Sequence, residues 1–472
     1  MSDRRFRFIG GITAGRLASG ISEFVSLALA ARLLGPSGYG QFSYFLAIAL
    51  ISAQLFDLGF SRVLTIRTSL LIGSGRDESA ISRAYGTLLG FRSLFALLSL
   101  PVLGWIAWSM NAWLLAAALC LGSMSSAVQC QSAIFQSELL FGRYSGALCL
   151  PSLLRVSVLA ILFVQGRRSL SALIVCYLAV HCLSVVLLMG LIPWHRVHVS
   201  VHGLLNGLAG LLSFGKWLMI TAVLEVLYMK ADVLSLKFLS SSYELGIYSS
   251  AFTFAGVLGM LFNSMVAYYV PLVCRAAGAG KLDELKQHFL ASADLHAIVG
   301  IPAAIGIWAV APSLFPLVFG HQYQQSIDVW PVLVIYSIVL MVNQTGLVFF
   351  ALQKLHLIPM ILSAIFLTDI VLSLFLVPRF GAIGAAWTVS IGMTVGMAVS
   401  WFMTYKTIGT IPNLRKMAYY LASSFVLFPI VRAVSLQHQG LSLLAKISTG
   451  VLVYGLMLGV GRVVSLRSKE AC

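Results

Sequence analysis

The chain has 472 residues, of which 59% are hydrophobic and only 10% are charged, and its mean hydropathy is +0.95. A water-soluble domain has about a quarter of its residues charged, so this composition excludes a soluble protein and indicates an integral membrane protein. The net charge of +16 is spread over short polar segments and forms no single basic patch, which argues against a nucleic-acid partner. The lipid bilayer is therefore the first partner that the sequence predicts.

Apolar runs of about twenty residues recur along the whole chain, without the alternating pattern of a membrane β-barrel. Backbone groups in hydrocarbon must satisfy one another, so these runs predict helices and an all-α membrane protein. We expect about fourteen spans. Their approximate limits are residues 8–32, 40–60, 84–108, 112–136, 145–165, 170–192, 205–236, 245–272, 288–311, 327–351, 356–377, 382–404, 415–434 and 441–462.

The basic residues between the spans predict the orientation of the chain. If the N terminus is cytoplasmic, most arginines and lysines of the connections, among them Arg4, Arg62, Lys286 and Lys406, fall on the cytoplasmic side. Short loops rich in Arg and Lys remain cytoplasmic. We therefore expect an even number of spans and both termini in the cytoplasm.

Two short segments resemble each other six spans apart. Gly40-Gln41-Phe42-Ser43 opens the second span and Gly246-Ile247-Tyr248-Ser249 opens the eighth. Internal repeats of this kind are typical of transporters. We therefore expect an N-terminal lobe over residues 1–204 (spans 1 to 6) and a second lobe over residues 205–410 (spans 7 to 12), followed by spans 13 and 14 and a cytoplasmic tail over residues 411–472.

Several segments carry a more specific pattern in chain order. They are Leu34-Gly35-Pro36-Ser37-Gly38-Tyr39-Gly40 with Asp57-Leu58-Gly59, Asp232 with Leu245-Gly246-Ile247-Tyr248, Pro302 with Leu317-Val318-Phe319-Gly320, and Val377-Pro378-Arg379-Phe380-Gly381-Ala382. Taken together, over roughly residues 8–405, the chain resembles the Wzx-type polysaccharide flippases of the MATE-like MOP superfamily. Asp369 departs from the asparagine that relatives often carry there.

The resemblance implies two six-helix bundles around a central cavity that opens alternately to either membrane face. It also implies a cargo, an undecaprenyl-diphosphate-linked oligosaccharide. The cargo would be carried from the inner to the outer leaflet of the bacterial plasma (inner) membrane for O-antigen, exopolysaccharide or capsule assembly. Polysaccharide polymerase and chain-length machinery are the protein partners that this role suggests.

Charged residues inside the predicted spans are the candidate functional groups, since each is costly to bury in lipid. The cations suit a diphosphate, because Arg offers bidentate donors and Lys a point charge to phosphate oxygens. The candidate cavity-lining cations are Arg16, Arg92, Arg155, Lys216 and Lys230. Snorkelling to the headgroups is an equally good reading for Arg92 and Lys216.

The acids in the spans are candidates for ion coupling, because a buried carboxylate can take up a proton. They are Glu23, Glu225, Asp232, Asp294 and Asp369. Glu23 follows Arg16 by seven residues, about 10.5 Å along a helix, so we expect it to pair with another span or to titrate. Lys230 and Asp232 could equally form a structural pair, and a membrane potential could drive transport without any dedicated acid.

Other polar residues have structural readings. Asp57 is expected to cap the turn near Arg62. His181 and His296 are expected to be hydrogen-bonded core residues, with a proton relay as the alternative. The seven cysteines have no paired metal spacing, so no metal and no cofactor are expected.

Two other functional classes compete with the flippase. A MATE-type, cation-coupled multidrug exporter would need net acid in its cavity, whereas the ions in these spans are nearly balanced. A membrane-embedded polymerase would need a long outer loop, and the chain shows none, nor an ATP-binding loop, so we expect no enzyme. For spans 13 and 14 we expect a groove that holds the polyprenyl tail, with Val431, Leu443 and Leu452 facing lipid.

Overall fold

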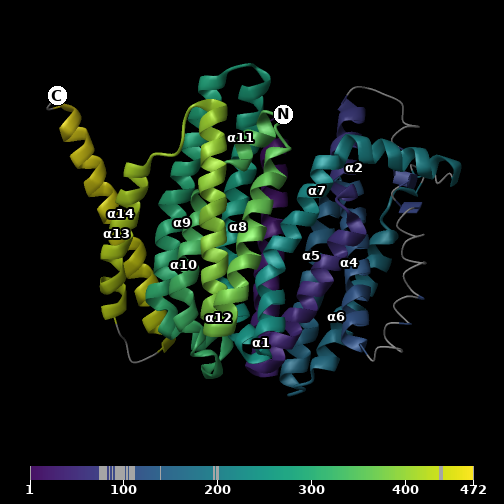
Figure 1. Ribbon diagram of the computed structural model, residues 1–472, viewed down its shortest axis with the longest axis horizontal. Coiled ribbons are helices and arrows are strands. Elements are labelled where there is room, and N and C mark those ends of the chain that lie inside the picture. The colour runs from purple at the N-terminus through teal and green to yellow at the C-terminus, as the bar shows by residue number, and fades with distance from the viewer. Residues whose placement is uncertain are drawn as a thin grey trace. The chain divides into compact units, whose positions relative to one another are not determined.

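The computed structural model describes residues 2–73, 82–83, 85–87, 89–90, 101, 105, 112–138, 140–194, 197, 201–434 and 439–470. Every regular element in these residues is a helix (Figure 1). The helices form two compact units, Met1–Gly246 and Ile247–Cys472. The fold is therefore that of an all-α protein, as the sequence predicts.

In the part of the chain that the structure describes, the first unit contains the following helices. They are α1 (Ser2–Asp57), α2 (Phe60–Gly73), α4 (Trp113–Ser137), α5 (Phe141–Val164), α6 (Leu170–Met189), α7 (Val201–Leu239) and the first turn of α8 (Ser242–Gly278). Helix α7 packs against α1 and α2. The unit therefore ends at Gly246, beyond the residue 204 at which the predicted first lobe ends, and the division into lobes 1–204, 205–410 and 411–472 stays a prediction.

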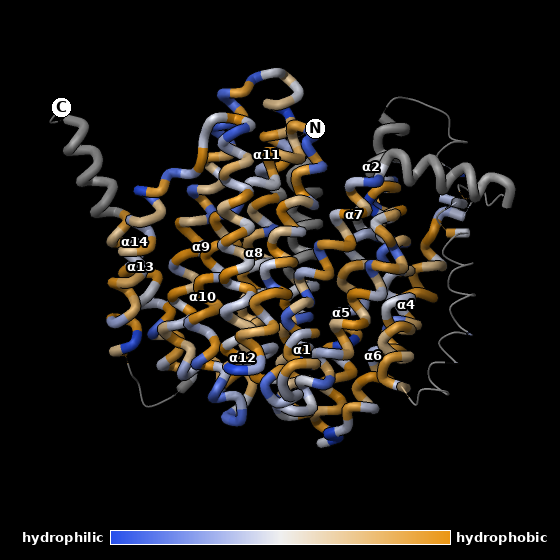
Figure 2. Tube along the Cα trace, in the orientation of Figure 1, coloured by the Kyte–Doolittle hydropathy of each residue, from blue (hydrophilic) through white to orange (hydrophobic). Residues whose placement is uncertain are grey.

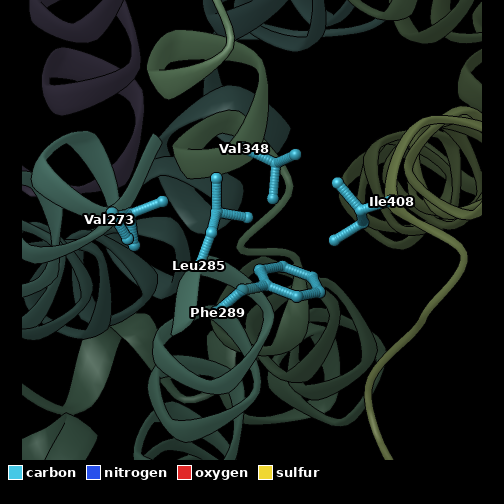
Figure 3. Packing of buried hydrophobic residues seen from close by; sticks show 6 residues of the cluster. Val273, Leu285, Phe289, Val348 and Ile408 are labelled. Carbon is cyan, nitrogen blue, oxygen red and sulfur yellow. The ribbon is translucent and has the colours of Figure 1, made fainter. Parts of the chain in front are cut away.

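The second unit holds the rest of α8 and all later helices. They are α9 (Leu282–Phe319), the short 3₁₀ helix η2 (His321–Tyr323), α10 (Ser326–Val342), α11 (Gly346–Ala351), α12 (Leu357–Ile408), α13 (Leu414–Ala433) and α14 (Gln439–Glu470). In Figure 3, Leu285 and Phe289 of α9 pack against Val273 of α8, Val348 of α11 and Ile408 of α12. This buried cluster holds one end of the unit together.

Nine helices in the described part of the chain are long and apolar enough to cross a membrane. Figure 2 shows hydrophobic residues along these helices and hydrophilic residues mainly near their ends. Two of the nine, α1 and α12, contain a non-helical glycine and each combine two helices. Helices also form where spans 7 and 13 are expected, while the total of fourteen spans stays a prediction.

The break in α1 lies at Gly35, whose φ of 67° and ψ of 175° no other residue adopts readily. Pro36 follows and starts the second helix, a position where the missing N–H of proline is harmless. The break in α12 lies at Gly381, with φ of 52° and ψ of −126°. Both glycines belong to the segments that suggested the flippase family.

The two halves of α12 run antiparallel and in close contact. A Cβ atom on Gly384 would collide with the carbonyl of Leu376, one on Gly392 with the carboxylate of Asp369, and one on Gly396 with Ile365. Small residues spaced four apart let membrane helices approach in this way. The Gly392/Gly396 spacing thus shapes the hairpin that contains Asp369.

Gly40 and Gly246, the first residues of the two similar segments, both lie in close backbone contacts inside the first unit. A Cβ atom on Gly40 would collide with the carbonyl of Ser242, and one on Gly246 with the carbonyl of Pro36. The starts of α8 and of the second half of α1 therefore touch backbone to backbone. Glycine is required at both positions because any side chain would push the helices apart.

Helices α13 and α14 dock on α9. Leu427 and Val431 of α13 and Leu443 of α14 pack into one buried cluster with Ala309 and Val310. Leu452, by contrast, is 67% exposed. The expectation that Val431 and Leu443 face lipid is wrong, because these side chains form the contact that joins the helix pair to the second unit.

Candidate functional site

The first unit contains a cavity of about 540 Å³ around Arg155, with polar and apolar side chains in its wall. Its wall comes from α1, α4, α5 and α6, and includes Ser19, Glu23, Ser152, Arg155 and His181. The first half of α1 runs parallel to α5, because Gly15 contacts Ser145 and Ser19 bonds with Ser152 further along. Because the two helices continue side by side, Glu23 of α1 lies opposite Arg155 of α5, about one turn beyond the contact between Ser19 and Ser152.

Arg155 and Glu23 form an ion pair between α5 and α1. Nη2 of Arg155 lies 2.5 Å from Oε2 of Glu23, and Nη1 donates to Oε1 over 3.2 Å. The Arg155 side chain is 12% exposed and that of Glu23 is 37% exposed. The expectation that Glu23 pairs with another span is confirmed, and two parallel bonds of this kind are among the stronger polar contacts in proteins.

Further contacts fix the guanidinium of Arg155 in place. Nε donates to the carbonyl of Pro151 over 3.2 Å, and Nη2 donates to Oγ of Ser152 over 3.1 Å. Cζ lies 5.4 Å from the ring centre of Tyr177, within cation–π distance. The cation is therefore preorganised at the cavity wall before any ligand arrives.

His181 and His296 are buried core residues, as expected. Nδ1 of His181 donates to the carbonyl of Tyr177 over 2.9 Å, and the ring of Tyr177 meets Phe42 edge-on at 5.1 Å between centres. Nδ1 of His296 lies 2.7 Å from the carbonyl of Ser292. His181 nevertheless also lines the cavity.

The other candidate cations are placed differently. The side chain of Arg16 and the whole of Arg92 lie outside the described residues. Lys216 is exposed, with Nζ 5.8 Å from the ring centre of Trp217, and Lys230 is half-buried on α7. Of the cations whose side chains are described, the cavity wall contains only Arg155 from the predicted set, and a cavity lined by the whole set stays a prediction.

Two further candidate acids form ion pairs elsewhere. Oε2 of Glu225 on α7 lies 3.5 Å from Nη2 of Arg62 on α2. Oδ2 of Asp294 on α9 lies 2.5 Å from Nζ of Lys416 on α13, and Tyr420 donates to the same carboxylate over 3.4 Å. These ion pairs connect α7 to α2 and α9 to α13.

Asp232 and Asp369 are each 2% exposed. Oδ1 of Asp232 accepts from the backbone N–H of Val233 over 2.7 Å. Asp369 lies in the α12 hairpin against Gly392. Their burial keeps both as candidates for ion coupling.

Asp57 caps α2, as expected. Its carboxylate accepts from the backbone N–H of Ser61 over 3.3 Å and from the Ser61 hydroxyl over 2.5 Å. It also lines a second cavity of about 380 Å³, together with Gln54, Arg62, Gln129 and Gln136. This second cavity was not predicted from the sequence, although glutamines that recur inside an apolar span are a signal that could have indicated it.

Comparison with known proteins places these features in a family. A model described as "Polysaccharide biosynthesis protein" matches residues 29–328. The "Probable flippase AglR" of Haloferax volcanii is 25% identical over 239 residues, which are 49% of this chain and 50% of that protein. The alignment thus spans about half the length of this relative.

Solved structures share the fold. The "Lipid II flippase MurJ, inward closed conformation" superposes with a TM-score of 0.75 at 12% identity, covering 96% of this chain and 99% of that one. An inward-facing multidrug resistance MATE family transporter of the MOP superfamily gives 0.67 at 13% identity, covering 84% and 98%. These similarities show that the chain has the same fold as these two proteins. The family match over residues 29–328 is more specific, and it shows that the chain belongs to the polysaccharide biosynthesis protein family.

Proposed function

We propose that this protein is a flippase for polyprenyl-diphosphate-linked oligosaccharides. It moves them from the inner to the outer leaflet of the bacterial plasma membrane by alternating access, for O-antigen, exopolysaccharide or capsule assembly. The family match and the flippase names of AglR and MurJ support this proposal. Both termini face the cytoplasm, and the product is delivered to polymerase and chain-length machinery at the outer face.

The observation that carries the proposal is the guanidinium of Arg155 at the cavity wall. A diphosphate moving through a membrane needs fixed donors to replace its water, and a preorganised Arg supplies two in the right geometry. Glu23 compensates Arg155 when the cavity is empty. Phosphate oxygens offer the same geometry as the carboxylate, so the cargo competes with Glu23 for the guanidinium.

The five candidate acids differ in how well the structure supports a role in ion coupling. Glu23, Glu225 and Asp294 pair with Arg155, Arg62 and Lys416, which favours charge compensation. Asp232 and Asp369 are buried within helices and are the acids we assign to coupling. The membrane potential is the alternative drive, since 100 mV contributes about 2.3 kcal/mol per charge.

Reconstitution tests the function. The purified protein in proteoliposomes should move a fluorescent undecaprenyl-diphosphate oligosaccharide between leaflets, which a membrane-impermeant quencher detects. Protein-free liposomes are the control. If the protein does not move this lipid but instead exports a small organic cation in exchange for protons or sodium, it is a MATE-type exporter and the proposal is wrong.

A further inference from the structure

The second cavity of the first unit is distinct in its chemistry from the Arg155 cavity. It is bounded by the C-terminal end of α1 and by α2, α4, α5 and α7, and has a volume of about 380 Å³. Its wall combines side-chain amides and hydroxyls, among them Gln54, Thr65, Gln129, Ser132 and Gln136. Cavities of a few hundred Å³ with a few convergent polar groups are typical small-molecule sites.

Three side-chain amides in this wall have no partner among the residues that the structure describes. Within the described part of the chain, the amides of Gln54, Gln129 and Gln136 make no hydrogen bond to another residue. Gln131, on another face of the same helix, instead donates to the carbonyl of Val185 over 3.1 Å. Polar groups in a membrane-spanning helix are expensive unless paired, so the three amides need water or a ligand.

The charges at this cavity are already compensated. Arg62 pairs with Glu225, and the carboxylate of Asp57 is engaged by Ser61 at the start of α2. Beside these paired charges, the cavity offers a ligand neutral amides and hydroxyls. An amide presents two donors and an acceptor, which suits a molecule rich in hydroxyl groups better than an anion.

One polar face of α4 connects the two cavities. Ser125 lines the Arg155 cavity, and Gln129, Ser132 and Gln136 continue along the same face into the second cavity. Tyr144 of α5 lines both. From Ser125 to Gln136 the helix rises about 16 Å, the length of a small headgroup.

We propose that this second cavity is a saccharide subsite, which binds the sugar next to the diphosphate while the Arg155 cavity holds the diphosphate itself. The inference rests on the proposed flippase function and adds a residue-level account of how the sugar is recognised. Gln54, Gln129 and Gln136 bond the sugar hydroxyls. The ring of Tyr144 forms the wall between the sugar and the phosphate regions.

Binding of two lipids to the purified full-length protein tests the subsite. The probes are undecaprenyl diphosphate and undecaprenyl diphosphate carrying N-acetylglucosamine. The variants are Gln129→Leu, Gln136→Leu and, from another helix, Gln54→Leu. Leucine has a similar size, and removing an amide without a partner leaves the fold stable. Gln131→Leu is the matched control on α4, since its amide serves the fold.

Wild type should bind the sugar-bearing lipid more tightly than undecaprenyl diphosphate. The Gln129→Leu and Gln136→Leu double variant should bind the sugar-bearing lipid about tenfold more weakly, as expected for two lost hydrogen bonds. Its affinity for undecaprenyl diphosphate should equal that of wild type. Gln131→Leu should leave the ratio of the two affinities unchanged.

Three results would overturn the assignment. Equal affinity of wild type for both lipids would show that the sugar is not bound, while leaving the flippase function intact. An equal loss for both lipids in the double variant would place the amides at the diphosphate or in the fold. If wild type binds neither lipid, the proposed function itself fails.

Discussion

Arg155 of α5 and Glu23 of α1 are joined by two parallel contacts, with 2.5 Å between Nη2 and Oε2 and 3.2 Å between Nη1 and Oε1. The pair faces a cavity in a protein whose proposed cargo carries a diphosphate. A carboxylate and a phosphate present the same acceptors to a guanidinium. Under the proposed function, Glu23 therefore holds the guanidinium in the geometry that a phosphate of the cargo would use.

Removing the competitor should strengthen binding. Glu23→Gln leaves Arg155 uncompensated, so the affinity for undecaprenyl diphosphate should rise about tenfold, the change expected when one charge-assisted bond no longer competes. Binding of a fluorescent undecaprenyl diphosphate to the detergent-solubilised protein measures this. Arg155→Gln should instead abolish binding.

A purely structural ion pair would behave differently. Both single variants would then bind equally poorly and unfold at lower temperature, and the charge-exchanged double variant, Glu23→Arg with Arg155→Glu, would recover stability and binding together. Recovery of binding in the exchanged protein would contradict a role of Arg155 at the phosphate.

The hairpin glycines should not tolerate side chains. Gly381→Ala places a Cβ at φ 52° and ψ −126°, a backbone conformation that only glycine adopts readily, so we expect a loss of about 1–3 kcal/mol in the free energy of unfolding. Gly409 has φ 71° and ψ 16°, a left-handed conformation that asparagine accepts. Thermal unfolding in detergent should show a large loss for Gly381→Ala and a small one for Gly409→Asn. Similar losses in the two would show that the Gly381 conformation is not required.

Close helix contact at Gly40 predicts a second stability effect. Gly40→Ala would bring its Cβ onto the carbonyl of Ser242, and we expect partial unfolding or poor insertion. Gly146, exposed on α5 with no atom within 4 Å of an added Cβ, is the matched control. Gly146→Ala should be neutral or should stabilise the helix by about 0.5–1 kcal/mol. If Gly40→Ala folds as stably as wild type, the close backbone contact between Gly40 of α1 and Ser242 of α8 would be contradicted.

Lys416 and Asp294 should matter mainly for the attachment of α13 to α9. Asp294→Asn leaves Lys416 without its carboxylate, and we expect a lower unfolding temperature with the flipping rate of the folded protein retained. The exchanged variant, Asp294→Lys with Lys416→Asp, should recover stability. Loss of flipping in a stable Asp294→Asn protein would instead assign Asp294 to ion coupling.

Local sequence predicted much of this architecture. The apolar runs predicted the helices, and Gly35, Pro36 and Gly381 predicted the breaks, because these features depend on a few neighbouring residues. Asp57 was expected as a cap for the same reason. Arg155 and Glu23 were found separately, since a charge in a span is rare, but their pairing depends on the parallel packing of α1 and α5.

Features set by packing were not predicted from the sequence. Val431 and Leu443 are as apolar as a lipid-facing residue, and only the docking of α13 and α14 on α9 decides that they are buried. The saccharide subsite arises because α4 turns Gln129 and Gln136 toward the end of α1 and the start of α2. Neither residue is charged, so neither stood out among the apolar spans.

The most direct test of the account is the flipping rate of Arg155→Gln in proteoliposomes, measured with a fluorescent undecaprenyl-diphosphate oligosaccharide. Arg168→Gln removes an equal charge from an exposed position after α5 and is the matched control. The account predicts that wild type and Arg168→Gln flip the lipid while correctly folded Arg155→Gln does not. Flipping by Arg155→Gln at the wild-type rate would contradict the central claim that this guanidinium carries the diphosphate across the membrane.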